Sequence, residues 1–210
     1  MTGVTAILLA AGQSKRMGTN KLLLEVGEKT LVERMVDVLS KSRVDRIIVV
    51  VGFEADRVRE RLAGRDVDVV FNHQYREGMA GSIRAGLRWI GRGSNGVLIA
   101  LADHPLLTPE TIDRLIDGYR RTEKGIVCPT YRGERGHPVI FNLRKYGEAL
   151  SKLEGDMGGK GVVETHRDDV LEIAVDSPGV IRDIDRWEDY QEFQRLVSQE
   201  LNRDDEEGAR

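Results

Sequence analysis

The sequence contains almost no cysteine, since Cys128 is the single one among 210 residues. One thiol excludes an intrachain disulfide and a cysteine-rich zinc site, and its place in an apolar run predicts a small buried residue. Long hydrophobic runs are also missing, because none approaches ~18 residues. We therefore expect no membrane span. No basic segment precedes a long apolar one near residue 1, so we expect no signal peptide and a cytoplasmic protein.

An excess of charge of one sign is missing as well. The net charge is −3 and the pI is near 5.9, although 32% of the residues are charged. Such a chain has no strong positive field, so we do not expect nucleic acid as a partner. The hydrophobic content of 40% is typical of a globular protein, and the length suits one domain. We expect this domain to cover residues 1–202 and a disordered tail to follow over 203–210.

Apolar runs alternate with helical patterns, which predicts a Rossmann-like α/β fold with a mostly parallel sheet and helices on both faces. The expected strands are 6–11, 47–51, 67–71, 96–102, 126–130, 139–141, 170–175 and 180–184. The expected helices are 31–39, 54–62, 82–90, 109–119, 143–153 and 187–201. Because a short polar loop separates 126–130 from 139–141, these two strands should pair antiparallel, and the sheet should be mixed.

The most informative stretch is LLAAGQSKRMGTNKLLL, residues 8–24. A buried strand stops at Gly12, and Gly12 with Gly18 allows backbone N–H groups to turn toward one point. Three cations surround that point: Lys15, Arg16 and Lys21. The stretch fits neither G-x-x-x-x-G-K-[ST] nor G-x-G-x-x-G, because its glycines are too far apart and Ser14 replaces the second glycine. It still favours a phosphate-rich ligand over the alternative, a surface turn with solvated cations.

Polar residues follow other expected elements in the same way. Asp103 comes directly after strand 96–102, at the sheet edge where ligands collect in open α/β folds, and a carboxylate there can hold Mg²⁺. The alternative is a turn aspartate that binds its own backbone before Pro105. Asp185 and Ser82 each precede an expected helix, so for both the alternative is a helix N-cap.

Residues 9–22 resemble the L-A-A-G-x-S-x-R-M-G-x-x-K-L loop of the MobA-like nucleotidyltransferases, with a match at every fixed position. The resemblance implies a fold of the nucleotide-diphospho-sugar transferase type and a loop that holds a nucleoside triphosphate. It implies catalytic roles for Arg16, Lys21 and Asp103. The nucleotide-binding residues that it implies are Leu9, Ala10, Ala11, Gly12, Ser14, Arg16, Lys21, Gly81 and Ser82. A-D-H-P, which contains Asp103, resembles the family's L-x-D-x-P. D-I-D-R-W-E-D-Y, which contains Asp185, resembles the family's D-I-D-T-P-E-D-L. These two matches imply that Asp103 and Asp185 hold Mg²⁺.

Two further segments resemble one subgroup, the cytidylyltransferases that act on molybdopterin. Residues 136–138 match its G-H-P-V-x-F motif, and G-D-M-G-G-K resembles its G-D-x-G-A-R, with lysine in place of arginine. Lysine keeps the charge but loses the bidentate fork. This resemblance implies transfer of CMP from CTP to the phosphate of the molybdenum cofactor, with release of pyrophosphate and with a molybdenum hydroxylase as a client. It implies that His137, Asp156 and Lys160 bind the acceptor.

Three alternatives stay open. A guanylyltransferase of the same family would use GTP, and Ala11 argues against it because Gly-Gly is expected where Ala11-Gly12 stands. An oxidoreductase would need nicotinamide binding, and the absence of G-x-G-x-x-G argues against that. A non-catalytic chaperone of the molybdenum cofactor is the third, and the presence of Asp103 and Lys21 argues against it. As a lone histidine, His137 can also be a structural hydrogen-bonding residue.

Overall fold

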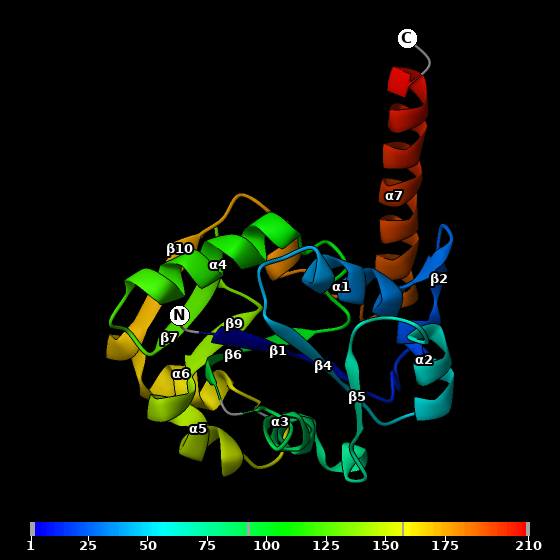
Figure 1. Ribbon diagram of the computed structural model, residues 1–210. Helices are drawn as coiled ribbons and strands as arrows, with labels where there is room; N and C mark the ends of the chain where they lie inside the picture. Colours follow the sequence, from blue (N-terminus) through cyan, green and yellow to red (C-terminus); the bar gives the residue numbers. More distant parts are fainter. Residues whose placement is uncertain (1–2, 92, 157, 209–210) are drawn as a thin grey trace.

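The computed structural model describes residues 3–91, 93–156 and 158–208, with side chains described as far as residue 199. Its centre is a mixed sheet of eight strands in the order β10-β7-β9-β6-β1-β4-β5, with β8 paired to β7 (Figure 1). The strands are β1 (Gly3–Ala10), β4 (Arg46–Val51), β5 (Asp68–Phe71), β6 (Ser94–Leu101), β7 (Ile126–Tyr131), β8 (Glu134–Arg135), β9 (Val139–Asn142) and β10 (Val170–Ala174). A separate hairpin pairs β2 (Glu25–Val26) with β3 (Lys29–Thr30).

The strand directions confirm the predicted mixed sheet. β1 pairs in parallel with both β4 and β6, and β4 pairs in parallel with β5. β9 runs antiparallel between β6 and β7, so the predicted antiparallel pair is present. The parallel centre of the sheet therefore sends the carboxyl ends of β1, β4, β5 and β6 to one edge.

Helices cover both faces of the sheet, as predicted (Figure 1). They are α1 (Leu31–Ser40), α2 (Ala55–Arg61), α3 (Met79–Leu87), α4 (Pro109–Arg121), α5 (Leu143–Ser151), α6 (Lys160–Thr165) and α7 (Trp187–Gly208), with short 3₁₀ turns η1 (Lys21–Leu23), η2 (Tyr75–Glu77), η3 (Arg167–Asp169) and η4 (Pro178–Val180). Alternate residues of β1 point to opposite faces, as the strand geometry requires. Ala6 and Leu8 pack with α1 and α4, whereas Ile7 packs with α3 and α5.

A third apolar cluster lies beside the sheet and joins segments that are distant in sequence. Met17 from the glycine loop packs in it with Ile184 and with Phe193 of α7. All three side chains are at most 5% exposed. This cluster anchors residues 12–20 and 183–185 to the same small core, so the two segments hold a fixed position relative to each other.

The predicted strand over 180–184 is wrong. The chain there forms the 3₁₀ turn η4 and then an irregular segment. Its backbone groups bond to loops instead of a strand, since Val180 O accepts from His137 N–H at 2.7 Å and Ile184 N–H donates to Asp103 O at 2.9 Å. Pro178 within the turn also favours a bend over a continuous strand.

Two of the predicted helices, α3 and α7, differ from their expected bounds by more than two residues. α3 begins at Met79, so Ser82 lies inside its first turn and is not the N-cap. α7 continues to Gly208 and passes through most of the segment in which we expected a disordered tail, while residues 209–210 lie outside the description. No helix in the described part of the chain is long and apolar enough to cross a bilayer.

Candidate functional site

A cavity of about 820 Å³ opens at the carboxyl edge of the parallel strands. Leu9 of β1 pairs with Leu101 of β6, so the loops that follow these strands leave the sheet side by side. The cavity is lined by residues 11–16 and Lys21 on one side, residues 75–79 and Ser82 on another, and Asp103, Gly155, Asp156, Asp183 and Asp185 on the rest. It is therefore the place where the glycine loop and the acidic residues meet.

The loop after β1 folds back on itself through its own backbone. Met17 N–H donates to Ser14 O at 3.0 Å, and Ser14 and Gly18 both have left-handed φ angles, 49° and 70°. Ser14 Oγ then accepts from Lys21 N–H at 3.1 Å, which closes the loop against η1. Because Met17 is buried in the third apolar cluster, the intervening residues are held at the mouth of the cavity.

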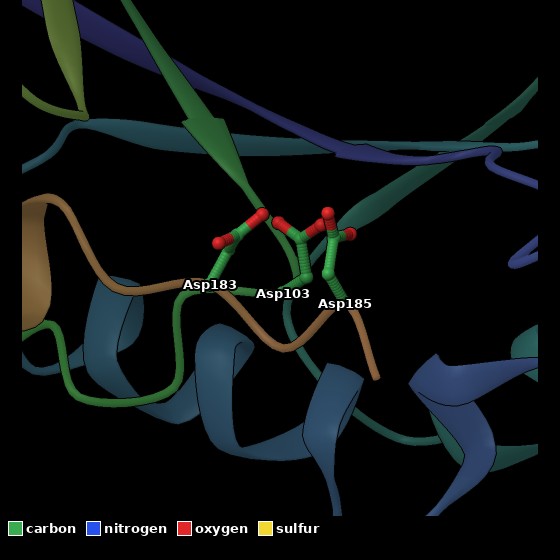
Figure 2. A group of neighbouring side chains, drawn as sticks. All are labelled: Asp103, Asp183 and Asp185. Atoms are coloured by element: carbon green, nitrogen blue, oxygen red, sulfur yellow. The ribbon is translucent and has the colours of Figure 1, made fainter. Parts of the chain in front are cut away.

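Three aspartates converge on the acidic side of the cavity (Figure 2). Asp103 comes from the loop after β6, and Asp183 and Asp185 come from the segment before α7, with all three carboxylates turned to the same side. One carboxylate oxygen from each lies within 4.8 Å of the others. The spacing fits one divalent cation that is bound by oxygen ligands.

Lys21 lies among these carboxylates. Its Nζ is 2.7 Å from Asp103 Oδ2 and 3.1 Å from Asp185 Oδ1, and it donates to Ile184 O at 2.6 Å. Burial by itself would lower the pKa of Lys21, but the charge of Asp103 and the hydrogen bonds to Asp103 and Asp185 outweigh it, so this pKa lies above its ordinary value. The ammonium is therefore charged at every physiological pH.

Asp185 is the meeting point of the cations. Arg16 Nη1 pairs with its Oδ2, and Lys21 with its Oδ1. Burial would raise the pKa of Asp185, but the hydrogen bond from Lys21 and the charges of Lys21 and Arg16 lower it below the ordinary value. The alternative of an N-cap does not fit Asp185, because α7 begins at Trp187 and both carboxylate oxygens of Asp185 pair with Arg16 and Lys21. Asp189 Oδ2 accepts from the N–H groups of Asp185 and Arg186.

The donor set fits a magnesium or manganese ion. Asp103 Oδ1 is buried and, among the residues that the structure describes, has no hydrogen-bond partner. A buried carboxylate oxygen without a partner is costly, and a bound cation removes this cost. The turn alternative for Asp103 would need its oxygens on neighbouring N–H groups, whereas Oδ2 binds Lys21. Burial, followed by the nearby Asp185 and Asp103, raises the pKa of Asp183, as expected for carboxylates that share one site.

Of the remaining residues predicted to bind the nucleotide, some line the cavity and others do not. Ser82 lines the cavity, and its Oγ accepts from Asn72 Nδ2 at 3.0 Å. Gly81 lies one residue away and faces a separate hollow next to Asn72. Ala10 is buried in the core at the end of β1, next to the cavity-lining Leu9 and Ala11.

The residues expected to bind the acceptor are not brought together. Asp156 lines the cavity, but its Oδ1 accepts from Met79 N–H at 3.1 Å and so caps α3. His137 lies behind Asp103 with its ring 5.6 Å from that of His104, and burial, then His104, lowers its pKa to about 4. Lys160 is an exposed residue at the start of α6, 3.8 Å from Glu164. Met157, within the same motif, lies outside the described residues.

Sequence reasoning missed three residues of the site. Asp183 was not assigned as a metal ligand, although residues i and i+2 of an extended segment share a side and Asp185 was already a candidate. Tyr75 lines the cavity and Asn72 holds Ser82, but neither belongs to a motif with a known role. Asn72 is buried directly after a strand, and the sequence alone does not indicate a functional role for such a residue.

Comparison with known proteins identifies the family. Residues 6–170 match the family described as the MobA-like NTP transferase domain. Nicotine blue oxidoreductase of Paenarthrobacter nicotinovorans is 31% identical over 165 residues, which cover 75% of this chain and 79% of that protein. Bifunctional protein GlmU of Francisella tularensis subsp. novicida is 29% identical over 154 residues, 72% of this chain and 33% of GlmU, so this chain spans about a third of that relative.

Solved structures agree with this. The crystal structure of Rv0371c from Mycobacterium tuberculosis H37Rv has a TM-score of 0.81 at 32% identity and covers 92% of this chain and 98% of that one. The same protein is also known in complex with manganese. A synthase of 4-diphosphocytidyl-2C-methyl-D-erythritol from Anaerococcus prevotii has a TM-score of 0.75 at 19% identity over 94% of this chain and 96% of its own, which confirms the predicted fold. The chain belongs to the MobA-like NTP transferase family and has its nucleotidyltransferase domain.

Proposed function

We propose that this nucleotidyltransferase moves CMP from CTP to the phosphate of the molybdenum cofactor, molybdopterin. A terminal phosphate oxygen of the acceptor would attack the α-phosphorus of CTP. The new bond forms between that oxygen and phosphorus as the bond to the β-phosphate oxygen breaks, and pyrophosphate leaves with its electron pair. Such a reaction leaves little covalent work for the protein, so positioning and charge stabilisation dominate.

One observation supports the proposal above all others. The cations of the glycine loop and three converging carboxylates face the same cavity, with Lys21 in contact with two of the carboxylates. A triphosphate with a divalent cation needs this combination, because the carboxylates would hold the cation, the cation would offset negative charge on the phosphates, and Arg and Lys would offset the rest. If the loop were only a solvated surface turn, we would not expect Lys21 to be buried among carboxylates.

The proposed roles follow from the positions of the side chains. Asp103, Asp183 and Asp185 would hold Mg²⁺, which supplies Lewis-acid stabilisation of the charge on the phosphate oxygens. Arg16 and Lys21 would bind the triphosphate and stabilise charge that develops as pyrophosphate leaves. The N–H groups of Gly12 and Ser14 and the hydroxyl of Ser82 would hold the nucleotide. No covalent nucleophile on the protein is needed.

The acceptor is proposed from the resemblance of the segments around His137 and Asp156 to the molybdopterin cytidylyltransferases. Of these two residues, only Asp156 lines the cavity. The nucleotide depends on Ala11, which lines the cavity beside Gly12 where guanylyltransferases have glycine. GTP as the substrate therefore remains the second candidate within the same chemistry.

Pyrophosphate release tests the proposal directly. Purified protein with Mg²⁺ or Mn²⁺ is mixed with CTP, GTP, ATP or UTP, each with and without molybdopterin, and Asp103→Asn serves as the inactive control. We expect release with CTP that depends on both the metal and the acceptor. Pyrophosphate release with GTP and with no other nucleotide would assign the protein to the guanylyltransferases and leave the reaction type unchanged. Nucleotide binding without pyrophosphate release would favour the non-catalytic chaperone. A parallel assay of NADH and NADPH oxidation tests the oxidoreductase alternative.

A further inference from the structure

The part of the cavity farthest from Asp103 and Lys21 is built around Tyr75, with Arg76 and Glu77 next to it. In the sheet, β6 lies on one side of β1, and β4 and β5 lie on the other. Asp103 follows β6, while Tyr75 follows β5, so the two residues border opposite ends of the cavity. If phosphates and metal occupy the end with Asp103 and Lys21, the nucleoside extends past Ala11 toward Tyr75.

Tyr75 is packed tightly against the end of β4. A methyl group placed on Gly52 would lie 2.5 Å from Tyr75 Cβ, 2.7 Å from its Cγ and 2.9 Å from Ala11 Cβ. Tyr75 and Ala11 therefore both lie against Gly52, and only glycine at position 52 lets the tyrosine lie so close to the backbone. The loop after β1 is tied to the same place, because Phe53 N–H donates to Ala11 O at 3.3 Å.

Hydrogen bonds fix Tyr75 from the other side. Its N–H donates to Asn72 O at 3.3 Å, and the buried Asn72 side chain accepts from Gln74 N–H at 3.0 Å while donating to Ser82 Oγ. On the solvent side the Arg76 guanidinium lies 5.5 Å from the centre of the Tyr75 ring. A ring held by packing, by the backbone and by a cation keeps one position, so it can set a dimension of the cavity.

We propose that Tyr75, held against Gly52, sets the width of the cavity on the side of the base and so favours pyrimidine over purine nucleotides. The inference depends on the proposed function, because it takes the cavity as the nucleotide site. It goes beyond that function because it gives the selectivity to a residue outside the recognised loop. A steric limit of this kind acts on the larger purine ring and leaves the smaller ring in place.

Equilibrium binding gives the sharpest test, since it needs no acceptor. Affinities for CTP and GTP with Mg²⁺ are measured by isothermal titration calorimetry on the wild type, Tyr75→Ala, Tyr75→Leu and Tyr75→Phe. Phe71→Ala is the matched control, because Phe71 is an aromatic residue of the same segment that lies beside His73, facing a separate hollow. Thermal unfolding of each variant reports whether it is folded.

We expect Tyr75→Ala to raise the affinity for GTP relative to CTP by about tenfold, Tyr75→Leu to raise it less, and Tyr75→Phe and Phe71→Ala to leave it unchanged. Equal losses for both nucleotides would make Tyr75 a general support and overturn the inference. A shift in Tyr75→Phe would assign selectivity to the hydroxyl and also overturn it. If Tyr75→Ala does not fold, Tyr75→Leu decides. Absence of nucleotide binding in the wild type would instead defeat the proposed function.

Discussion

The two ends of the cavity are held together by different forces. At the charged end, ion pairs join Arg16 and Lys21 to Asp185, across separations of 169 and 164 residues. At the other end, Tyr75, Ala11 and Gly52 are held by close packing, and Asn72 joins them to Ser82 by hydrogen bonds between uncharged groups. The charged end can bind the phosphates that every nucleoside triphosphate carries, whereas the end around Tyr75 can distinguish one base from another.

This difference predicts how changes at each end should act. Loss of a charge at the first end should reduce the rate for every nucleotide, because charge on phosphate oxygens is common to all of them. A change of shape at the second end should alter the ratio between nucleotides and leave the chemistry in place. Each of the following variants tests this division.

The largest effect is expected from Asp103→Asn. Removal of the carboxylate charge while its shape is kept should weaken metal binding and lower kcat by on the order of 10³-fold, because the metal supplies several kcal/mol of charge stabilisation. Pyrophosphate release and Mn²⁺ binding are the measurements. Asp113→Asn, which removes a surface carboxylate paired with Arg43, is the matched control. A folded Asp103→Asn protein with ordinary activity would show that Asp103 is not a ligand.

The two cations come next. Lys21→Ala and Arg16→Lys should lower kcat and kcat/KM together, with a loss on the order of 2–4 kcal/mol in transition-state stabilisation. Arg16→Lys keeps the charge but loses the two parallel donors, so a large loss would indicate a bidentate grip on phosphate. Steady-state kinetics with CTP measures this. Normal turnover of either variant would place that residue outside the phosphate site.

A smaller effect is expected from Ala11→Gly. Removal of one methyl group next to Tyr75 should improve kcat/KM for GTP relative to CTP by on the order of 1–3 kcal/mol at most, since a single methyl biases selection without fixing it. The measurement is a competition between the two nucleotides. Combined with Tyr75→Ala, the effects should be less than additive, because both side chains lie against Gly52. Full additivity would mean that they act separately.

The smallest effect is expected from Lys160→Ala. The side chain of Lys160 is 76% exposed and, within the described part of the chain, forms an ion pair only with Glu164, at 3.8 Å. An exposed pair of this kind contributes little to stability, and a cation outside the cavity has no phosphate to stabilise. We expect kcat/KM to change less than about twofold. A strong loss would return Lys160 to the acceptor site predicted from the sequence and would show that the site extends beyond the cavity.

The charged end of the cavity could be predicted from the sequence far better than the end around Tyr75. Lys21 and Asp103 both follow buried strands, and the carboxyl ends of neighbouring parallel strands meet at one edge, so composition and topology together indicate the site. Asp183 and Asn72 depend instead on how irregular segments fold over that edge. The strand predicted over 180–184 shows the limit, because its apolar residues serve a loop whose hydrogen bonds go to Asp103 and His137.

The end of the cavity around Tyr75 depends on contacts between residues distant in sequence, and no sequence motif indicates such contacts. Gly52 matters because the Tyr75 ring lies directly against it, and this contact needs the chain to turn back after β5. Likewise, the sequence left a helix cap open as the alternative for Ser82, whereas the start of α3 at Met79 is set by Gly155 and Asp156, about 75 residues later, which accept the first N–H groups of the helix. Tertiary contacts of this kind override local signals.

Lys21 gives the site a counter-ion of its own. Its ammonium pairs with both Asp103 and Asp185 and so offsets part of their charge before any metal arrives. If a nucleotide entered together with Mg²⁺, Asp103, Asp183 and Asp185 would hold the cation, and the Lys21 ammonium would be free to bind phosphate. Lys21 would then keep an anionic partner, which avoids an uncompensated buried charge. The protein should accordingly bind free Mn²⁺ weakly and bind it much more tightly with nucleotide, a coupling that Lys21→Gln should diminish.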